Sequence, residues 1–215
     1  NENENIVIIK NNNARDNYFS LFQDAYKSSS TNNVLATETY LNSGMSALKS
    51  KLIKGAKNII VLPSKDVKFV SDFFTKLNAI VNQRAYHDYD IQVYGLGDLL
   101  SFNNIDVNYL SRFNTRFTKP SYVDYASGPI QAMSIDFREK HNYDPNRYVF
   151  ASFEAVLYHT YLIAASGENF LKNYASTTFN GSHINYSFKR SNESGYENKA
   201  VVVVGFENNQ LKKID

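Results

Sequence analysis

Four short apolar runs alternate with segments of helical periodicity in the first half of the chain, and this alternation limits the fold more than any other feature. The apolar runs are residues 5–10, 33–40, 58–62 and 90–94. Between them, hydrophobic side chains recur at spacings of three and four, in residues 14–27, 45–53 and 67–81. Continuous apolar strands separated by helices predict a parallel sheet with helices on both faces. Right-handed crossovers then give a doubly wound, Rossmann-like α/β layer.

The segment after residue 62 indicates where the longest helix of this half begins. Pro63 ends the strand, and we expect Ser64 to be the N-cap. A stripe of seven apolar side chains follows at helical spacing: Val67, Val70, Phe73, Phe74, Leu77, Ile80 and Val81. This stripe predicts a helix that packs one face on the sheet.

The second half of the chain changes character. A short helix at 106–113 and a short strand at 115–118 precede three expected helices, at 128–140, 148–165 and 167–174. The first of these should face inward with Ile130, Met133 and Phe137. The second should face inward with Phe150, Phe153, Val156, Leu157 and Tyr161.

The tail is expected to form β structure, with strands at 184–188, 200–206 and 210–214. Asn208-Asn209 predicts a tight turn that joins the last two strands as a hairpin. We therefore expect three parts: an α/β lobe at 1–118, a crossing segment with helices at 119–178, and a C-terminal β segment at 179–215.

Composition excludes several classes of function. Among 215 residues, 23 Lys and Arg face 21 Asp and Glu, and a net charge of +2 is too weak for nucleic-acid binding. The absence of cysteine removes thiol catalysis, disulfide scaffolds and zinc ribbons. The longest apolar runs, 58–62 and 200–206, are far below the roughly 20 residues of a membrane span. No signal peptide is visible; the chain opens at Asn1 without Met, and we expect a processed product or a piece of a larger protein.

The motifs of known enzymes are missing or incomplete. Gly95-Leu96-Gly97 follows a strand, but Leu100 replaces the third glycine of a dinucleotide fingerprint. Ser46 and Lys49 have the Ser-x-x-Lys spacing without its partner motifs. The four histidines, His87, His141, His159 and His183, are not at metal-ligand spacing. We expect no catalytic residue, no metal and no cofactor.

The order of elements resembles that of type I periplasmic binding proteins, the two-lobed receptors of branched-chain amino acids. Residues 58–64 with the following helix are similar to the family strand that leads to a loop at the cleft, and 91–95 (Ile-Gln-Val-Tyr-Gly) resemble its "vyG" strand. Residues 137–145 and the helix that follows resemble the family's helix, "Y…P" and helix. Modules of this kind that follow LysM repeats in Bacteroidetes have a similar Asn-, Tyr- and Lys-rich texture.

Two departures from the family pattern limit what the resemblance implies. The first lobe's opening strands and helices have no counterpart, so we expect mainly the second lobe plus the later crossing segments. Apolar surface on the later helices must then be covered by a missing first lobe or a second copy. In addition, Phe153-Glu154 stands where the family helix commonly begins with a Tyr-Asp pair, so a ligand contact at Glu154 is not implied.

The resemblance implies a non-enzymatic module of the bacterial periplasm or cell envelope that binds a small solute, often an amino acid, by hinge closure. Ser64, at a helix N-terminus, would meet a carboxylate, and Tyr94, at a strand end, would line the cleft. Tyr122 and Asp124 would contribute from the crossing segment. By position alone, at strand ends or connections, Tyr94, Tyr122 and Tyr125 are candidates for binding. Two other classes stay open: a structural or adaptor envelope domain whose cleft is lost, and a Rossmann-like enzyme. A transporter or another envelope protein would be a partner of the receptor class.

Overall fold

The computed structural model describes residues 4–13, 16–29, 36–39, 45–191 and 195–214. It divides into two compact units, the first comprising residues 1–118 and 205–212 and the second 119–204 and 213–215. Parts of the predicted segments at 14–27 and 33–40 lie outside the described residues, as does the side chain of Ser46.

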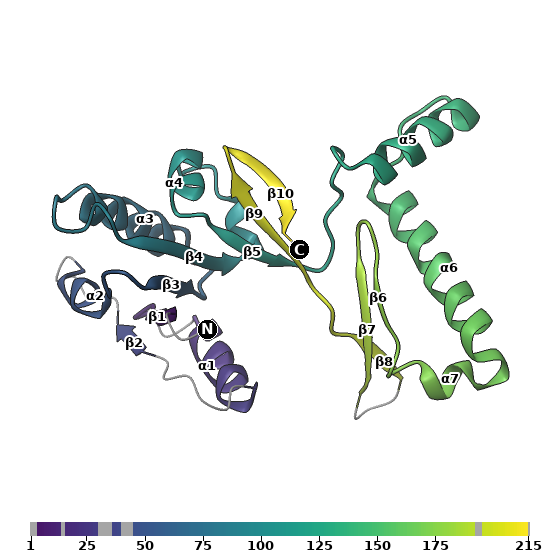
Figure 1. Cartoon of the computed structure of the whole chain (residues 1–215), viewed down its shortest axis with the longest axis horizontal. Coiled ribbons are helices and arrows are strands. Elements are labelled where there is room, and N and C mark those ends of the chain that lie inside the picture. The colour runs from purple at the N-terminus through teal and green to yellow at the C-terminus, as the bar shows by residue number, and fades with distance from the viewer. Residues whose placement is uncertain (1–3, 14–15, 30–35, 40–44, 192–194, 215) are drawn as a thin grey trace. The chain divides into compact units, whose positions relative to one another are not determined.

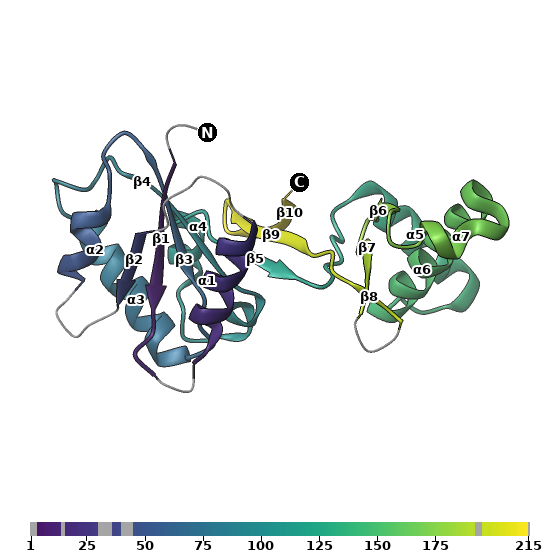
Figure 2. The same cartoon turned by 90° about the horizontal axis from the view of Figure 1, so that it is seen from below.

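Unit 1 contains the predicted alternation of strands and helices (Figures 1 and 2). In chain order its elements are β1 (Glu4–Lys10), α1 (Tyr18–Ser29), β2 (Ala36–Thr39), α2 (Ser46–Lys51), β3 (Lys57–Leu62), α3 (Val67–Val81), β4 (Asp90–Leu96), the 3-10 turn η1 (Gly97–Ser101), α4 (Val107–Arg112) and β5 (Arg116–Lys119). Strands β9 (Val202–Glu207) and β10 (Gln210–Ile214) extend the same sheet.

The strand order of this sheet is β10-β9-β5-β4-β3-β1-β2, and β1 to β5 are parallel. The chain first moves from β1 to β2 on one side and then returns past β1 to β3 and β4 on the other. In Figure 1, α1 therefore lies below the sheet and α3 and α4 above it. The prediction of a doubly wound, mainly parallel sheet is confirmed. Asn208 and Asn209 have φ angles of 52° and 61°, as a tight hairpin turn requires, and join β9 to β10.

The core of unit 1 fills both faces of the sheet. On one face, Phe19 of α1 packs on Ile8 and Val61. The α3 stripe packs inward as predicted, with Phe69, Val70, Phe73, Phe74, Leu77, Ile80 and Val81 all buried. Val67, which the sequence placed in this stripe, is 37% exposed because it is the first residue of the helix.

The N-cap of α3 is Asp66, so the prediction of Ser64 is wrong. Asp66 Oδ1 accepts the backbone N–H groups of Lys68 at 3.0 Å and Phe69 at 3.2 Å. Ser64 lies two residues earlier, fully buried, and its hydroxyl oxygen accepts the N–H of Asp66 at 3.1 Å. The cap lies two residues later than predicted because the Asp66 carboxylate, and not the Ser64 hydroxyl, reaches the first free N–H groups of the helix.

Unit 2 combines helices with a small antiparallel sheet. Its helices are α5 (Gly128–His141), α6 (Arg147–Ser166) and α7 (Phe170–Asn173), the last preceded by the 3-10 turn η2 (Gly167–Asn169). Strands β6 (Thr178–Asn180), β7 (Asn185–Arg190) and β8 (Tyr196–Asn198) form the sheet in that order. The sequence predicted β7 but missed β6 and β8, each only three residues long.

The predicted inward face of α6 is largely wrong. Phe150 is buried as expected, but the other buried residues are Glu154, Tyr158 and Leu162. Phe153, Val156, Leu157 and Tyr161 are between 45% and 67% exposed. The helix turns this way because Tyr158 is surrounded by aromatic rings, among them Tyr186, which stacks on it with centroids 4.8 Å apart. On α5, Ile130 is buried, whereas Met133 and Phe137 are half-buried.

Candidate ligand-binding site

Polar side chains gather at the carboxyl edge of the unit 1 sheet, where β1 and β3 end next to each other. Asn11, Asn13 and Asp16 follow β1, and Ser64 and Asp66 follow β3. From β1 the chain leaves toward β2 on one side, and β3 lies on the other, so this point is where the strand order reverses. In open α/β sheets, ligands bind outside the carboxyl ends of the strands at such a point.

These five side chains form one hydrogen-bonded network. The Ser64 hydroxyl donates to the Asp16 carboxylate. The Asn11 amide donates to Asp16 Oδ2 at 3.1 Å and to Ser64 Oγ at 3.4 Å, while the Asn13 amide donates to Asp66 Oδ2 at 3.4 Å. The loop after β1 is thereby bound to the loop after β3.

The network carries negative charge. The backbone N–H of Phe69 holds the pKa of Asp66 below its usual range, with further help from Asn13, Asn11 and the N–H of Lys68. The other Asp16 oxygen, Oδ1, is enclosed and accepts no hydrogen bond from the described residues. Two carboxylates, bound mainly by amides and a hydroxyl, favour a ligand that donates hydrogen bonds, such as an ammonium group.

A hollow of about 230 Å³ lies beside the network, lined by Asn13, Asp16, Tyr18, Lys65 and Asp66. The Lys65 ammonium lies 4.9 Å from the centre of the Tyr18 ring and 3.3 Å from Asp98. Hydrogen bonding to Tyr18 and then to Asp98 raises the pKa of Lys65, which therefore keeps its charge. The hollow thus presents one cation beside two carboxylates, a set that can meet both charges of a zwitterionic ligand.

The four residues that the sequence proposed as ligand contacts fall into two pairs. Ser64 and Tyr94 belong to unit 1, and Tyr122 and Asp124 to unit 2. Ser64 lies within the polar network, but its hydroxyl already donates to Asp16. Tyr94 lies on β4 and packs on the apolar cluster under α1, where its hydroxyl accepts a hydrogen bond from Arg116 at 3.3 Å.

Tyr122 and Asp124 lie in the segment before α5. The N–H of Tyr122 donates to the carbonyl of His183 at 2.9 Å, and Asp124 Oδ1 accepts the N–H of Ala126 at 3.0 Å. Burial, and then the charge of Asp124, raise the pKa of Tyr122, so its phenol stays protonated at neutral pH. Both residues are half-buried.

Sequence reasoning missed Asn11, Asn13, Asp16 and Asp66. The signal is present in the sequence, because polar residues directly follow two apolar strands that are predicted to be parallel. If β1 and β3 are assumed to be neighbours in the sheet, the loops that follow them are expected to meet at its carboxyl edge.

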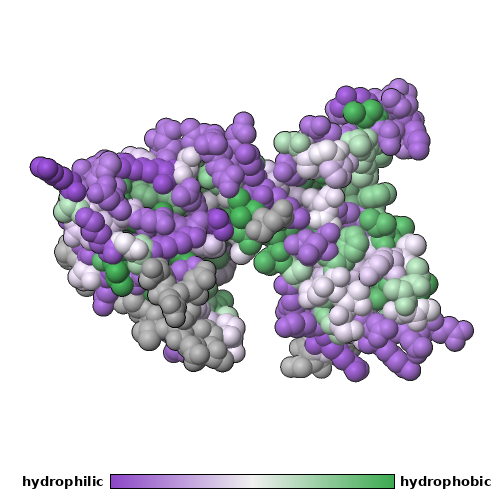
Figure 3. Space-filling model, viewed as in Figure 1, coloured by the Kyte–Doolittle hydropathy of each residue, from purple (hydrophilic) through white to green (hydrophobic). Residues whose placement is uncertain are grey.

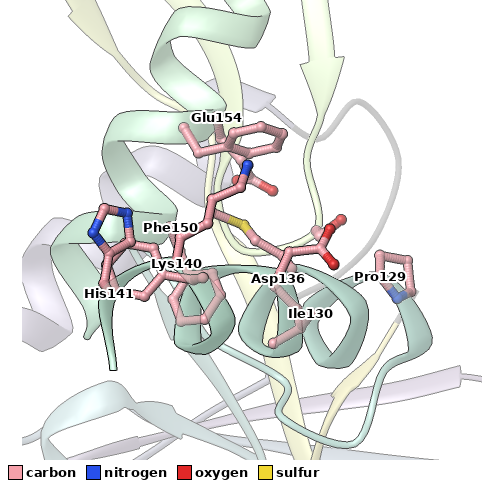
Figure 4. Close-up of a pocket in the computed structure, with 11 residues that line it drawn as sticks. Pro129, Ile130, Asp136, Lys140, His141, Phe150 and Glu154 are labelled. Carbon is pink, nitrogen blue, oxygen red and sulfur yellow. The ribbon is translucent and has the colours of Figure 1, made fainter. Parts of the chain in front are cut away.

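Unit 2 has a larger cavity, of about 490 Å³, between α5, α6 and the turn that joins β6 to β7 (Figure 4). Asp136, Lys140 and His141 project from α5, and Phe150 and Glu154 from α6. Glu154 is 4% exposed and accepts the N–H groups of His183 at 2.9 Å and Ile184 at 2.8 Å. These bonds tie α6 to the β6–β7 turn.

The imidazole of His183 lies beside this carboxylate without a good hydrogen bond. Its Nδ1 is 3.5 Å from Glu154 Oε2 and has no hydrogen-bond partner among the described residues. The two amide bonds, both under 3 Å, therefore hold the carboxylate more firmly than the ring does. Across the described part of the chain, no cluster of three His, Asp or Glu side chains could hold a metal ion.

Unit 2 is expected to lose stability in acid through Glu154. Burial pushes the pKa of this carboxyl up, but the nearby imidazole of His183 and the backbone N–H groups of Ile184 and His183 together outweigh burial and bring it below its usual value. A carboxyl with a lowered pKa stabilises the fold above its unfolded-state pKa of about 4.3, and this contribution is lost as the pH falls through the lower folded value. Urea midpoints between pH 7 and pH 3 should fall less in Glu154→Gln than in the unchanged protein. Equal falls would contradict this assignment.

Comparison with solved structures decides the fold. A substrate-binding protein of an ABC transporter from Desulfitobacterium hafniense, in complex with Leu, superposes with a TM-score of 0.54 at 13% identity. The alignment covers 99% of this chain and 60% of the other. The chain has the type I periplasmic-binding-protein fold. The resemblance drawn from the sequence is confirmed at this level.

Two further structures with this fold agree. A putative branched-chain amino acid ABC transporter protein from Rhodospirillum rubrum gives a TM-score of 0.50 at 12% identity, and another D. hafniense substrate-binding protein gives 0.52 at 10%. In each case 99% of this chain matches 60% of the other, so the chain spans less than two thirds of these binding proteins. No protein-family model and no curated protein matches the sequence.

Proposed function

We propose that the chain is part of a non-enzymatic solute-binding protein and that its ligand is a small amino-acid-like molecule. The observation that carries the proposal is the polar network at the point where the strand order of unit 1 reverses. The solved structures of the same fold support it, since they include a substrate-binding protein in complex with Leu. A place in the periplasm or cell envelope and a transporter partner follow by the same analogy.

The network suggests how such a ligand is held. Asp16 and Asp66 accept hydrogen bonds from the ligand ammonium, and Ser64 orients Asp16 rather than binding a carboxylate itself. Lys65 lines the same hollow and meets the ligand carboxylate. Tyr94 in unit 1, and Tyr122 and Asp124 in unit 2, remain proposed ligand contacts.

One observation favours a second candidate, an adaptor domain with a lost cleft. The network residues largely satisfy one another, since Ser64, Asn11 and Asp16 are joined by hydrogen bonds within the unit. Polar groups that already form hydrogen bonds with one another gain less free energy from binding a ligand. This reading predicts that no polar metabolite stabilises the chain.

A thermal unfolding screen against the common L-amino acids and matching amines tests the proposal. A ligand at about 100 times its Kd should stabilise the binding unit by about 2.7 kcal/mol, which corresponds to a rise in Tm of several degrees. Asp16→Asn should abolish the rise, whereas Asp88→Asn, a change at an exposed carboxylate of unit 1, should keep it. Stabilisation by no compound would favour the adaptor.

A further inference from the structure

The charges that line the hollow of unit 1 do not balance. Asp16 and Asp66 each contribute a carboxylate, while Lys65 contributes the single cation of the described lining. The ammonium of Lys65 is paired with Asp98, at 3.3 Å, and neither Asp16 nor Asp66 forms an ion pair with a described residue. The described lining therefore has an excess of negative charge, and this excess is larger when Asp98 is counted with it.

The two carboxylates are neighbours and keep hydrogen-bonding capacity for a ligand. Asn11 Nδ2 lies 3.1 Å from Asp16 Oδ2 and 3.5 Å from Asp66 Oδ2, so one amide group contacts both. Asp66 Oδ2 is held only by the amides of Asn11 and Asn13, at 3.5 and 3.4 Å, which is the long limit of a hydrogen bond. Because Asp66 Oδ1 caps α3, Oδ2 is the oxygen that can accept a stronger donor. A cation near both carboxylates also lowers the repulsion between them.

The hollow has little hydrophobic surface. Apart from the Tyr18 ring, its described lining consists of polar or charged side chains. Exposed hydrophobic side chains gather instead over α6 of unit 2 (Figure 3), where Phe153 and Leu157 are exposed. An aliphatic ligand side chain would make few apolar contacts in the hollow, so the hydrophobic effect would contribute little to its binding. A polar ligand side chain suits this lining better.

Resting on the solute-binding function proposed above, we propose that the ligand of unit 1 is an amino acid with a cationic side chain. A neutral amino acid brings one ammonium group to two carboxylates, so one carboxylate would lose water without gaining a cation, which is costly. An amino acid such as lysine, ornithine or arginine brings two cationic groups and one carboxylate. These charges match Asp16, Asp66 and Lys65 one to one.

Each charged group of such a ligand then has its own partner. Asp16, which two side chains of the network hold in place, takes the α-ammonium. Asp66 Oδ2 is held more loosely and takes the side-chain cation. Lys65 takes the ligand carboxylate, since an ammonium has three donors and can keep its contacts with Tyr18 and Asp98. Lys65 also disfavours a diamine, which has no carboxylate to offer it.

Thermal unfolding of the full chain with matched ligands tests the proposal. Norleucine lacks only the side-chain ammonium of lysine, citrulline has a neutral group in place of the guanidinium of arginine, and cadaverine is lysine without its carboxylate. We expect lysine or arginine to raise the Tm by several degrees, and the Kd of each matched analogue to be at least about tenfold higher.

The possible outcomes separate this proposal from the proposed function. If norleucine, cadaverine or another ligand without both charges bound as tightly as lysine, the class of cationic amino acids would be wrong, and solute binding would stand. If no amino acid stabilised the chain, both would be wrong. Since salt screens charge pairs, the preference for lysine over norleucine should also fall as the NaCl concentration rises. A preference independent of salt would contradict the charge match.

Two substitutions test the partner of each charge. Asp66→Asn keeps the cap of α3, because asparagine caps as well as aspartate, and should lower the preference for lysine over norleucine below about threefold. Lys65→Met should raise the Kd of lysine at least about tenfold without weakening cadaverine. Asp88→Asn, the same change of charge at an exposed position of unit 1, is the control and should keep the full preference. A preference that survives Asp66→Asn unchanged would overturn the charge match on which the proposal depends.

Discussion

Glu154→Ala is expected to reduce the stability of unit 2 by about 4 kcal/mol, because each buried N–H left without an acceptor costs about 1–3 kcal/mol. The carboxylate accepts the N–H groups of His183 and Ile184 and is almost fully buried. Alanine also leaves space beside Gly181, where a Cβ would lie 2.6 Å from Glu154 Oε2. The backbone at Gly181 has therefore approached the carboxylate more closely than any other residue type allows.

Urea unfolding monitored by hydrogen exchange of peptides from β7 measures the loss of stability in unit 2 separately from unit 1. Glu154→Gln keeps one acceptor oxygen and should fall between the unchanged protein and Glu154→Ala. Glu139→Ala, an exposed glutamate of α5, is the matched control and should change stability by less than about 0.5 kcal/mol. If Glu154→Ala and Glu139→Ala had the same midpoint, the two amide bonds would not hold the turn to the helix.

The sequence predicted unit 1 well because its local patterns agree with its tertiary structure. The stripe at 67–81 became α3 with the same bounds, since seven apolar residues at helical spacing leave only one face to bury. The apolar run at 58–62 became β3 because a central parallel strand is covered on both sides. In such elements, periodicity alone selects the buried residues.

In unit 2 the same reasoning failed for α6, because apolar side chains surround the helix. Phe153, Val156 and Leu157 are as hydrophobic as the residues that are buried, so periodicity cannot choose between the two sides. The choice depends on tertiary contacts of Tyr158 and on the amides that bind Glu154. Strands β6 and β8 are too short to show alternation.

The candidate site was predicted only as an edge of the sheet. Ser64 was predicted to lie at that edge because it directly follows an apolar strand. Its partner Asp16 lies 48 residues away in the sequence, in a loop whose conformation cannot be predicted from a local pattern. Ser64 was also predicted to cap α3, but the cap is Asp66. The order of strands in the sheet brings such loops together. This order depends on tertiary contacts, which local sequence patterns do not contain.

Asn58 has the second large expected effect, in unit 1. It is fully buried on β3, and its Oδ1 accepts the N–H of Ile53 at 2.8 Å and the side-chain amide of Asn5 at 2.9 Å. Its Nδ2 donates to the carbonyls of Ile53 at 3.0 Å, Ala56 at 3.0 Å and Asp90 at 3.1 Å. One side chain thus joins the turn before β3 to the neighbouring strands β1 and β4.

Asn58→Leu should therefore cost unit 1 about 4 kcal/mol or more, although leucine has a similar volume and is hydrophobic. The substitution removes the shared partner of several bonds at once, so the N–H of Ile53 and the carbonyls of Ile53, Ala56 and Asp90 all lose the side chain that joins them. Hydrogen exchange of peptides from β3 and β4 should become fast while peptides from β7 are unchanged. Asn104→Leu, at an exposed position of the same unit, controls for the added hydrophobic side chain. A gain in stability would mean that hydrophobic burial at the centre of the sheet outweighs the network of Asn58.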